Sequence, residues 1–127
     1  AITVAGMVPT VCRMLLPEIK ADPSRCASLR RIVVTGEAFP VDLKRQFPAL
    51  LPDVRLVSFF AMTEVGGVTS LSHEEQFDHA TSIGRPTPGV EVRIVDDAGR
   101  DVAIGEPGEL LVRVGEPGCY SVMRGYY

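Results

Sequence analysis

The sequence lacks an apolar stretch long enough to cross a membrane. Its longest apolar runs are residues 32–34 and residues 57–62, the second interrupted by a serine, whereas a membrane-spanning helix needs about 20 apolar residues. The first residues also lack a basic segment followed by an apolar one, which is the pattern of a secretory signal. We therefore expect neither a membrane span nor secretion.

Cysteine is scarce and is not arranged in pairs. The three cysteines, Cys12, Cys26 and Cys119, are far apart and form no C-x-x-C motif. This pattern excludes a disulfide framework and argues against a zinc knuckle. We expect reduced thiols and a cytoplasmic location.

Positive charge is not concentrated anywhere in the chain. Thirteen Lys and Arg stand against sixteen Asp and Glu, which gives a net charge of −3, and the cations are scattered along the sequence. A nucleic-acid-binding protein usually has a basic face. We therefore expect no nucleic-acid partner.

Two segments contain metal-binding residue types without the spacing that a metal site needs. Residues 73–77 read HEEQF, so Phe77 stands where the zinc motif H-E-x-x-H has its second histidine. The acidic residues around position 96 lack EF-hand spacing. We interpret residues 73–77 as a solvated loop and residues 96–100 as a hairpin turn.

The composition is that of a folded globular protein. Of the 127 residues, 46% are hydrophobic and 23% are charged, a balance that excludes a disordered tail. The length suits one domain of ordinary size. The sequence begins with alanine rather than methionine, which raises the question of whether it is a piece of a longer protein.

The first half of the chain alternates between helical and strand patterns. Apolar residues at helical spacing in residues 2–19 predict an amphipathic helix that begins near Thr10 or just before it, with Pro9 in its first turn, and that is ended or kinked by Pro17. The short β-branched run at residues 29–34 predicts a strand buried on both faces of a parallel sheet.

A second helix and a second strand follow. Residues 40–50 predict a helix with one apolar face, and residues 53–62 predict another strand. A helix between two parallel strands implies a right-handed crossover. We therefore expect a strand–helix–strand unit of α/β type.

The pattern changes after residue 69. Residues 70–81 are polar and predict an exposed connection, and beyond residue 83 the apolar residues alternate with a period of two. Residues 90–95 and 110–114 therefore predict antiparallel strands. The fold class expected is a partial parallel βαβ sheet in residues 1–80, followed by antiparallel β strands in residues 81–127.

Two loops stand out as places for chemistry, residues 35–38 and residues 60–67. Both follow predicted strands, and ligands bind at the carboxyl edge of an open α/β sheet. Thr63 offers a hydroxyl group, Glu64 offers a hard oxygen ligand suited to Mg²⁺, and Phe60 offers a flat apolar surface. These parts fit a nucleotide site, although glycine and Thr-Glu pairs also serve plain turns and helix caps.

Four segments resemble, in order, the motifs of adenylate-forming enzymes, the superfamily of acyl-CoA synthetases, nonribosomal-peptide adenylation domains and beetle luciferases. Residues 58–64, SFFAMTE, resemble its core motif N-x-Y-G-x-T-E. Residues 34–40, VTGEAFP, resemble its G-G-E-A-L-P loop, and residues 83–91, IGRPTPGVE, resemble v-G-r-P-x-p-G-x-e. Residues 105–127 contain GEPGEL and MRGYY, which resemble G-E-x-G-E-L and m-x-G-Y-y.

The resemblance implies an ATP-dependent ligase that uses Mg²⁺. Such enzymes join a carboxylic acid to the α-phosphate of ATP, release pyrophosphate and pass the acyl group of the acyl-adenylate to a thiol, commonly that of CoA. Thr63 and Glu64 are implied as catalytic residues, with the Thr63 hydroxyl on the α-phosphate and Glu64 holding Mg²⁺. The residues implied to line the ATP/AMP and acyl sites are Gly36, Glu37, Ala38, Phe60, Ala61, Met62 and Thr63.

The sequence departs from the family motifs at four positions. Thr35 replaces a glycine, Ser58 replaces the asparagine that contacts the adenine edge, Phe60 keeps the ring of a tyrosine without its hydroxyl, and Ala61 adds a Cβ where the family has glycine. These changes, with the MRGYY ending, favour an acyl-CoA synthetase over a peptide-synthetase domain.

Other functional motifs of the family have no counterpart in these 127 residues. Nothing resembles the phosphate loop, the ribose-binding Asp or the catalytic Lys. We therefore expect an internal fragment: residues 1–80 from the α/β AMP-binding subdomain and residues 81–127 from the start of a β-barrel-like subdomain.

This fragment is expected to be inactive alone and to self-associate through uncovered sheet edges. The expected partners are a carboxylic-acid substrate and CoA, or a carrier-protein thiol. The alternatives are a fragment of a nonribosomal-peptide adenylation domain, a degenerate synthetase-like domain and a non-catalytic α/β interaction module.

Overall fold

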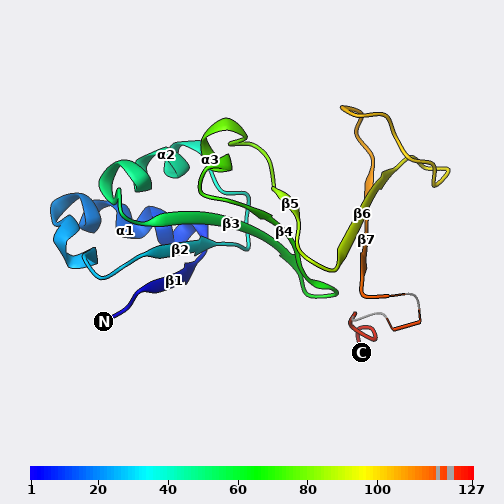
Figure 1. Cartoon of the computed structure of the whole chain (residues 1–127), viewed down its shortest axis with the longest axis horizontal. Helices are drawn as coiled ribbons and strands as arrows, with labels where there is room; N and C mark the ends of the chain where they lie inside the picture. Colours follow the sequence, from blue (N-terminus) through cyan, green and yellow to red (C-terminus); the bar gives the residue numbers. More distant parts are fainter. Residues whose placement is uncertain (117, 120–121) are drawn as a thin grey trace. The chain divides into compact units, whose positions relative to one another are not determined.

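A computed structural model describes residues 1–116, 118–119 and 122–127. Figure 1 shows the chain with its helices and strands labelled. By their contacts the residues form two units. The first unit contains residues 1–60 and 69–85, and the second contains residues 61–68 and 86–127. The elements in chain order are β1 (Val4–Met7), α1 (Pro9–Ala21), the 3₁₀ helix η1 (Pro23–Cys26), β2 (Arg31–Val34), α2 (Val41–Leu50), β3 (Arg55–Met62), β4 (Gly66–Leu71), α3 (Glu75–Asp78), β5 (Arg85–Pro86), β6 (Val90–Val95) and β7 (Glu109–Val114).

The strands form two sheets of different kinds. One sheet has the order β1-β2-β3-β4-β5, and the other pairs β6 with β7. β1, β2 and β3 are parallel, with Val34 of β2 beside Ser58 of β3, whereas β6 and β7 are antiparallel. The predicted fold class, a parallel βαβ sheet followed by antiparallel strands, is therefore confirmed. The subdomain boundary at residue 80 stays a prediction.

One face of the parallel strands carries the core. α1 connects β1 to β2 and α2 connects β2 to β3, and the right-handed preference of crossovers between parallel strands places both helices on the same face of the sheet. Residues from both helices and from β2 and β3 bury their side chains together, among them Cys12, Leu16, Ile19, Ile32, Val34, Leu43, Phe47 and Leu56. Burial raises the pKa of the Cys12 thiol to about 11, which keeps it protonated at neutral pH.

The prediction that residues 29–34 are buried on both faces is wrong for this chain. Ile32 and Val34 are buried, but Val33 between them is only half-buried and Arg31 is exposed. In the part of the chain that the structure describes, both long helices lie on the Ile32 side. The opposite face of β2 therefore has no helix over it.

The N-terminal segment differs from the single predicted helix. Residues 4–7 form β1, whose apolar side chains merge with the helical pattern that follows. The helix begins at Pro9, as the first-turn preference of proline predicts. It continues through Pro17 to Ala21, because buried Leu16 and Ile19 on either side of the proline pack into the core and offset the lost backbone hydrogen bond.

No helix of the described residues is long and apolar enough to cross a membrane.

The segment after β3 also differs from prediction, because a strand follows it at once. Residues 63–65 form a turn, and β4 begins at Gly66. So short a connection between neighbouring strands makes them antiparallel, since a parallel pair needs a crossover of about a dozen residues.

The polar stretch of residues 70–81 is only partly exposed. Gln76 on α3 is 1% exposed; its amide donates to the Leu71 carbonyl over 2.9 Å and accepts from the Ser58 hydroxyl over 3.0 Å. Lys44 of α2 is also buried, its amino group donates to the Ala80 carbonyl over 2.6 Å, and burial lowers its pKa. Paired polar groups can be buried where unpaired ones cannot, so polarity alone misled the prediction.

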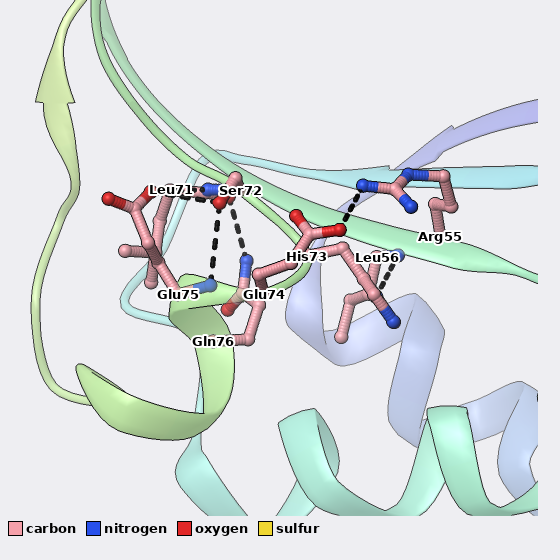
Figure 2. Close-up of polar contacts among 8 residues, drawn as sticks. All are labelled: Arg55, Leu56, Leu71, Ser72, His73, Glu74, Glu75 and Gln76. Atoms are coloured by element: carbon pink, nitrogen blue, oxygen red, sulfur yellow. Dashed lines mark hydrogen bonds and ion pairs between the residues drawn. The ribbon is translucent and has the colours of Figure 1, made fainter.

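Figure 2 shows how this stretch is tied to β3. The Leu56 N–H donates to Nδ1 of His73 over 3.0 Å, and Arg55 forms an ion pair with Glu74. Ser72 and Glu75 exchange backbone-to-side-chain hydrogen bonds as a capping box. The solvated loop predicted at residues 73–77 is therefore an anchored, half-buried segment.

The antiparallel pair matches its prediction closely. β6 and β7 pair from Val90 beside Val114 to Val95 beside Glu109. The predicted turn at residues 96–100 is present, because the Asp96 carboxylate accepts hydrogen bonds from two backbone N–H groups of the turn, at 2.9 Å each.

Candidate functional site

Gly36, Glu37 and Ala38 form an exposed loop in the first unit, directly after β2. Gly36 has a φ of +92°, and a Cβ there would lie 3.1 Å from Cγ1 of Val8, so the turn favours glycine. The Thr10 hydroxyl donates to a carboxylate oxygen of Glu37 over 3.3 Å. The loop is thus tied to the beginning of α1, while its backbone stays open to a ligand.

Phe60, the fourth predicted residue of the first unit, lies near the end of β3 and is half-buried. Since β2 and β3 are parallel and in register, the loop after β2 and the end of β3 lie at the same edge of the sheet. Ser58, two residues earlier, is 9% exposed and its hydroxyl is bonded to Gln76. The Ser58 side chain is therefore engaged in the core.

The other predicted residues belong to the second unit. Ala61 and Met62 finish β3, and Thr63 and Glu64 lie in the turn that follows. Ala61, Met62 and Thr63 are exposed, and Glu64 is half-buried. A hydroxyl group and a carboxylate thus stand next to each other where the strand ends, which is where an open α/β sheet binds its ligands.

Glu64 is held at both its backbone and its side chain. The Met123 N–H donates to the Glu64 carbonyl over 2.7 Å, and the Tyr126 hydroxyl donates to Oε1 of Glu64 over 2.6 Å. The Tyr126 hydrogen bond is the main reason that the pKa of Glu64 is lowered, and the same bond raises the pKa of Tyr126. Glu64 is therefore a carboxylate at neutral pH.

The carboxylate of Glu64 suits one kind of metal site, in which the ion is also bound by a nucleotide. The described residues contain no group of three or more His, Cys, Asp and Glu side chains that could enclose an ion. Mg²⁺ is commonly bound through one or two carboxylates together with substrate phosphates and water. Glu64 alone fits a Mg²⁺ ion that is shared with a nucleotide, and it does not fit a metal enclosed by protein.

Sequence reasoning missed two side chains that contact predicted site residues. Thr10 lies at the beginning of α1 and bonds Glu37, and Tyr126 bonds Glu64. Tyr126 is part of the MRGYY segment, but no spacing in the sequence indicates that it meets a residue 62 positions earlier.

Comparison with known proteins gives one family. The model of the AMP-binding enzyme family matches residues 1–127. L-proline--[L-prolyl-carrier protein] ligase of Streptomyces coelicolor is 37% identical over 113 residues, which cover 86% of this chain and 21% of that protein. Long-chain-fatty-acid--CoA ligase of Thermus thermophilus is 32% identical over 136 residues, which cover 99% of this chain and 24% of that protein.

Solved structures give the same result. O-succinylbenzoate coenzyme A synthetase of Bacillus subtilis, in complex with ATP and magnesium ion, has a TM-score of 0.79 at 27% identity over 98% of this chain and 24% of that chain. The chain therefore spans about a fifth to a quarter of the length of these relatives.

Proposed function

The chain belongs to the AMP-binding enzyme family, and on that basis we propose that it is a segment of an ATP-dependent acyl-activating ligase. In the proposed reaction a carboxylate oxygen attacks the α-phosphorus of ATP, the bond to the β-phosphate breaks and pyrophosphate leaves. A thiol then attacks the acyl-adenylate, forming a thioester and releasing AMP. The observation that carries the proposal is the pair Thr63 and Glu64, which occupies the family motif at the carboxyl end of β3.

The second unit would contribute to phosphate chemistry. The exposed Thr63 hydroxyl would donate a hydrogen bond to the α-phosphate, where negative charge increases during attack. Glu64 would hold Mg²⁺, which when bound offsets charge on the phosphate oxygens. Ala61 and Met62 would border the phosphate and the acyl group.

The first unit would contribute to adenine and acyl binding. The half-buried ring of Phe60 offers a flat surface for the adenine, and a base stacked on an aromatic side chain gains about 1–3 kcal/mol. Gly36, Glu37 and Ala38 would border the adenine and the acyl pocket through a backbone that carries no bulky side chain at Gly36. Since Ser58 is bonded inside the core, adenine recognition would depend on this backbone and on stacking.

We propose CoA as the thiol acceptor, with a carrier-protein thiol as the alternative. The MRGYY segment at residues 123–127 and the absence of asparagine at position 58 support CoA. Relatives of both kinds match the chain. A thioester assay of the longer parent protein with CoA and with a carrier protein distinguishes the two acceptors.

The test of nucleotide binding is a titration of the ¹⁵N-labelled chain with AMP, observed by NMR. We expect amide shifts at Thr63 and Glu64, with an affinity in the millimolar range, equivalent to about −4 kcal/mol. Thr63→Val should weaken these shifts, whereas the matched control Thr81→Val, in an exposed position outside the motif, should retain them. No shift at either residue in saturating AMP would favour a non-catalytic interaction module.

The chain by itself is proposed to be inactive, since these 127 residues contain no counterpart of the family's phosphate loop or catalytic Lys. We expect no exchange of labelled pyrophosphate into ATP above the level of a Glu64→Gln variant. Exchange that exceeds this level would contradict the proposal.

Self-association is proposed at the β1 edge. β1 is an outer strand of its sheet, and the side chains of Ile2 and Val4 are 72% and 56% exposed. Unpaired strand edges promote association, so light scattering should give a mass above that of the monomer. A monomer at all concentrations would count against it.

A further inference from the structure

Tyr126 and Glu64 lie near opposite ends of the second unit's sequence, and their side chains are joined by a hydrogen bond. Its hydroxyl donates to Oε1 of Glu64 over 2.6 Å, while the Met123 N–H holds the Glu64 carbonyl over 2.7 Å. The two bonds come from one short segment, residues 123–126. Together they fix the backbone and one carboxylate oxygen of a single residue, and they leave the second oxygen, Oε2, without a hydrogen bond from Tyr126.

We propose that Tyr126 is a positioning residue that makes Glu64 a one-oxygen ligand and so favours Mg²⁺ over Ca²⁺ at this position. The inference rests on the proposed role of Glu64 as the metal ligand. Because Oε1 already accepts the Tyr126 hydrogen bond, it has one acceptor site fewer than Oε2 for a cation, and coordination through Oε2 is favoured.

The two cations differ in what they require from a carboxylate. Mg²⁺ is small, requires nearly ideal octahedral geometry and keeps several waters, so a single well-oriented oxygen suits it. Ca²⁺ accepts more ligands and often takes both oxygens of a carboxylate. A hydrogen bond to Oε1 therefore helps the first cation by orienting the ligand and hinders the second by occupying an oxygen.

Tyr126 can be tested by substitution without loss of core packing. The residue is 75% exposed, so the loss of its hydroxyl removes one hydrogen bond and no core packing. Tyr127 beside it is fully exposed and provides a matched control, since Tyr127→Phe removes the same hydroxyl group from the neighbouring position.

The test uses the ¹⁵N-labelled 127-residue chain in saturating AMP, because Glu64 alone suits an ion that is shared with a nucleotide, with Mn²⁺ as a paramagnetic probe. Bound Mn²⁺ should broaden the amide signals of residues 63–66, and adding Mg²⁺ or Ca²⁺ should restore them by competition. The concentrations of Mg²⁺ and Ca²⁺ that restore half the signal give their relative affinities. The variants are Tyr126→Phe, Tyr127→Phe and Glu64→Gln.

We expect Tyr126→Phe to weaken Mg²⁺ competition about tenfold relative to Ca²⁺, at the low end of the 10–100-fold effects of groups that orient metal ligands. Tyr127→Phe should keep the ratio of the unaltered chain. An unchanged ratio in Tyr126→Phe, with broadening abolished in Glu64→Gln, would overturn this inference alone. Broadening that persists in Glu64→Gln, or that is absent from residues 63–66 of the unaltered chain, would overturn the proposed metal role of Glu64 as well.

Discussion

The two units of this chain are stabilised in different ways. Among the described residues, the first unit contains nearly all of the buried hydrophobic side chains, and the second contributes Val68 and Val95. The hairpin of β6 and β7 has instead a regular ladder and ion pairs on its surface, Arg93 with Asp101 and Arg113 with Glu91. Apolar burial contributes much more free energy than exposed ion pairs.

The difference in stabilisation between the two units concerns the residues proposed to bind the ligand. The proposed phosphate and metal ligands, Thr63 and Glu64, belong to the second unit, which has less core of its own. A two-stranded hairpin is only marginally stable in water, and ligand-binding elements commonly come from the less stable parts of a protein. We infer that the first unit gives the chain its stability, whereas the second carries the proposed ligands on a part of the chain with less core of its own.

The sharpest test of this comparison is Phe47→Ala in α2. Phe47 is 2% exposed within the core, and truncating a buried phenylalanine costs about 3–5 kcal/mol in the free energy of unfolding. We expect amide hydrogen exchange to accelerate throughout β2 and β3. Met14→Ala in α1 is the matched control, because Met14 is 72% exposed and the change should cost less than about 0.5 kcal/mol.

Equal acceleration of exchange in β6 and β7 would break the comparison, since it would mean that the hairpin depends on the same core.

Substitution of Gly108 gives the corresponding test of the second unit. A Cβ on Gly108 would lie 2.5 Å from the Val95 carbonyl oxygen and 2.8 Å from Cγ2 of Ile94. We expect Gly108→Ala to cost about 1–3 kcal/mol, as overpacking does, and to raise the exchange rates of β6 and β7 amides while leaving β2 unchanged. Gly6→Ala is the control, because a Cβ on Gly6 meets nothing within 4 Å. If Gly108→Ala proves as mild as Gly6→Ala, the hairpin tolerates more rearrangement than its ladder implies.

The ability of the sequence to predict structure also differs between features. The stretch from β2 to β3 follows from its β-branched runs and the helical period between them. β1 was missed because Val4 and Met7 continue the apolar pattern of the helix that follows. The burial of Gln76 and Lys44 was missed because sequence polarity does not show that their partners are the Leu71 and Ala80 carbonyls.

The features of the candidate site also differ in how well the sequence predicts them. The motif positions of Thr63 and Glu64 follow from sequence, because adjacent residues in a turn after a strand are a local feature. The contact of Tyr126 with Glu64 depends on how distant segments meet. No local pattern contains that information.

Buried Lys44 predicts a pH dependence of the first unit. Burial lowers its pKa in the folded chain below the ordinary value of 10.5. Between these two values the unfolded chain binds a proton that the folded chain releases, so the contribution of Lys44 to stability rises with pH through that window. Urea unfolding at a series of pH values that rise from neutral toward 10.5 should show this increase, and Lys44→Met should reduce it. The exposed Lys20→Met in α1 is the control and should retain it; a rise of equal size in Lys44→Met would contradict the assignment.

The smallest expected effect is the coupling between Arg93 and Asp101 on the hairpin. Their side chains are 55% and 68% exposed, with Nε 2.8 Å from Oδ1, and exposed pairs of this kind contribute about 0.2–1 kcal/mol. A double-mutant cycle with Arg93→Ala and Asp101→Ala, measured by hydrogen exchange of β6 amides, gives the coupling free energy. The same cycle on Arg55 and Glu74 in the first unit, 54% and 63% exposed, should give a similar value, because both pairs are equally open to water. A coupling on the hairpin several times larger would mean that the second unit depends on its surface charges, and its stability would then fall with added salt while that of the first unit would not.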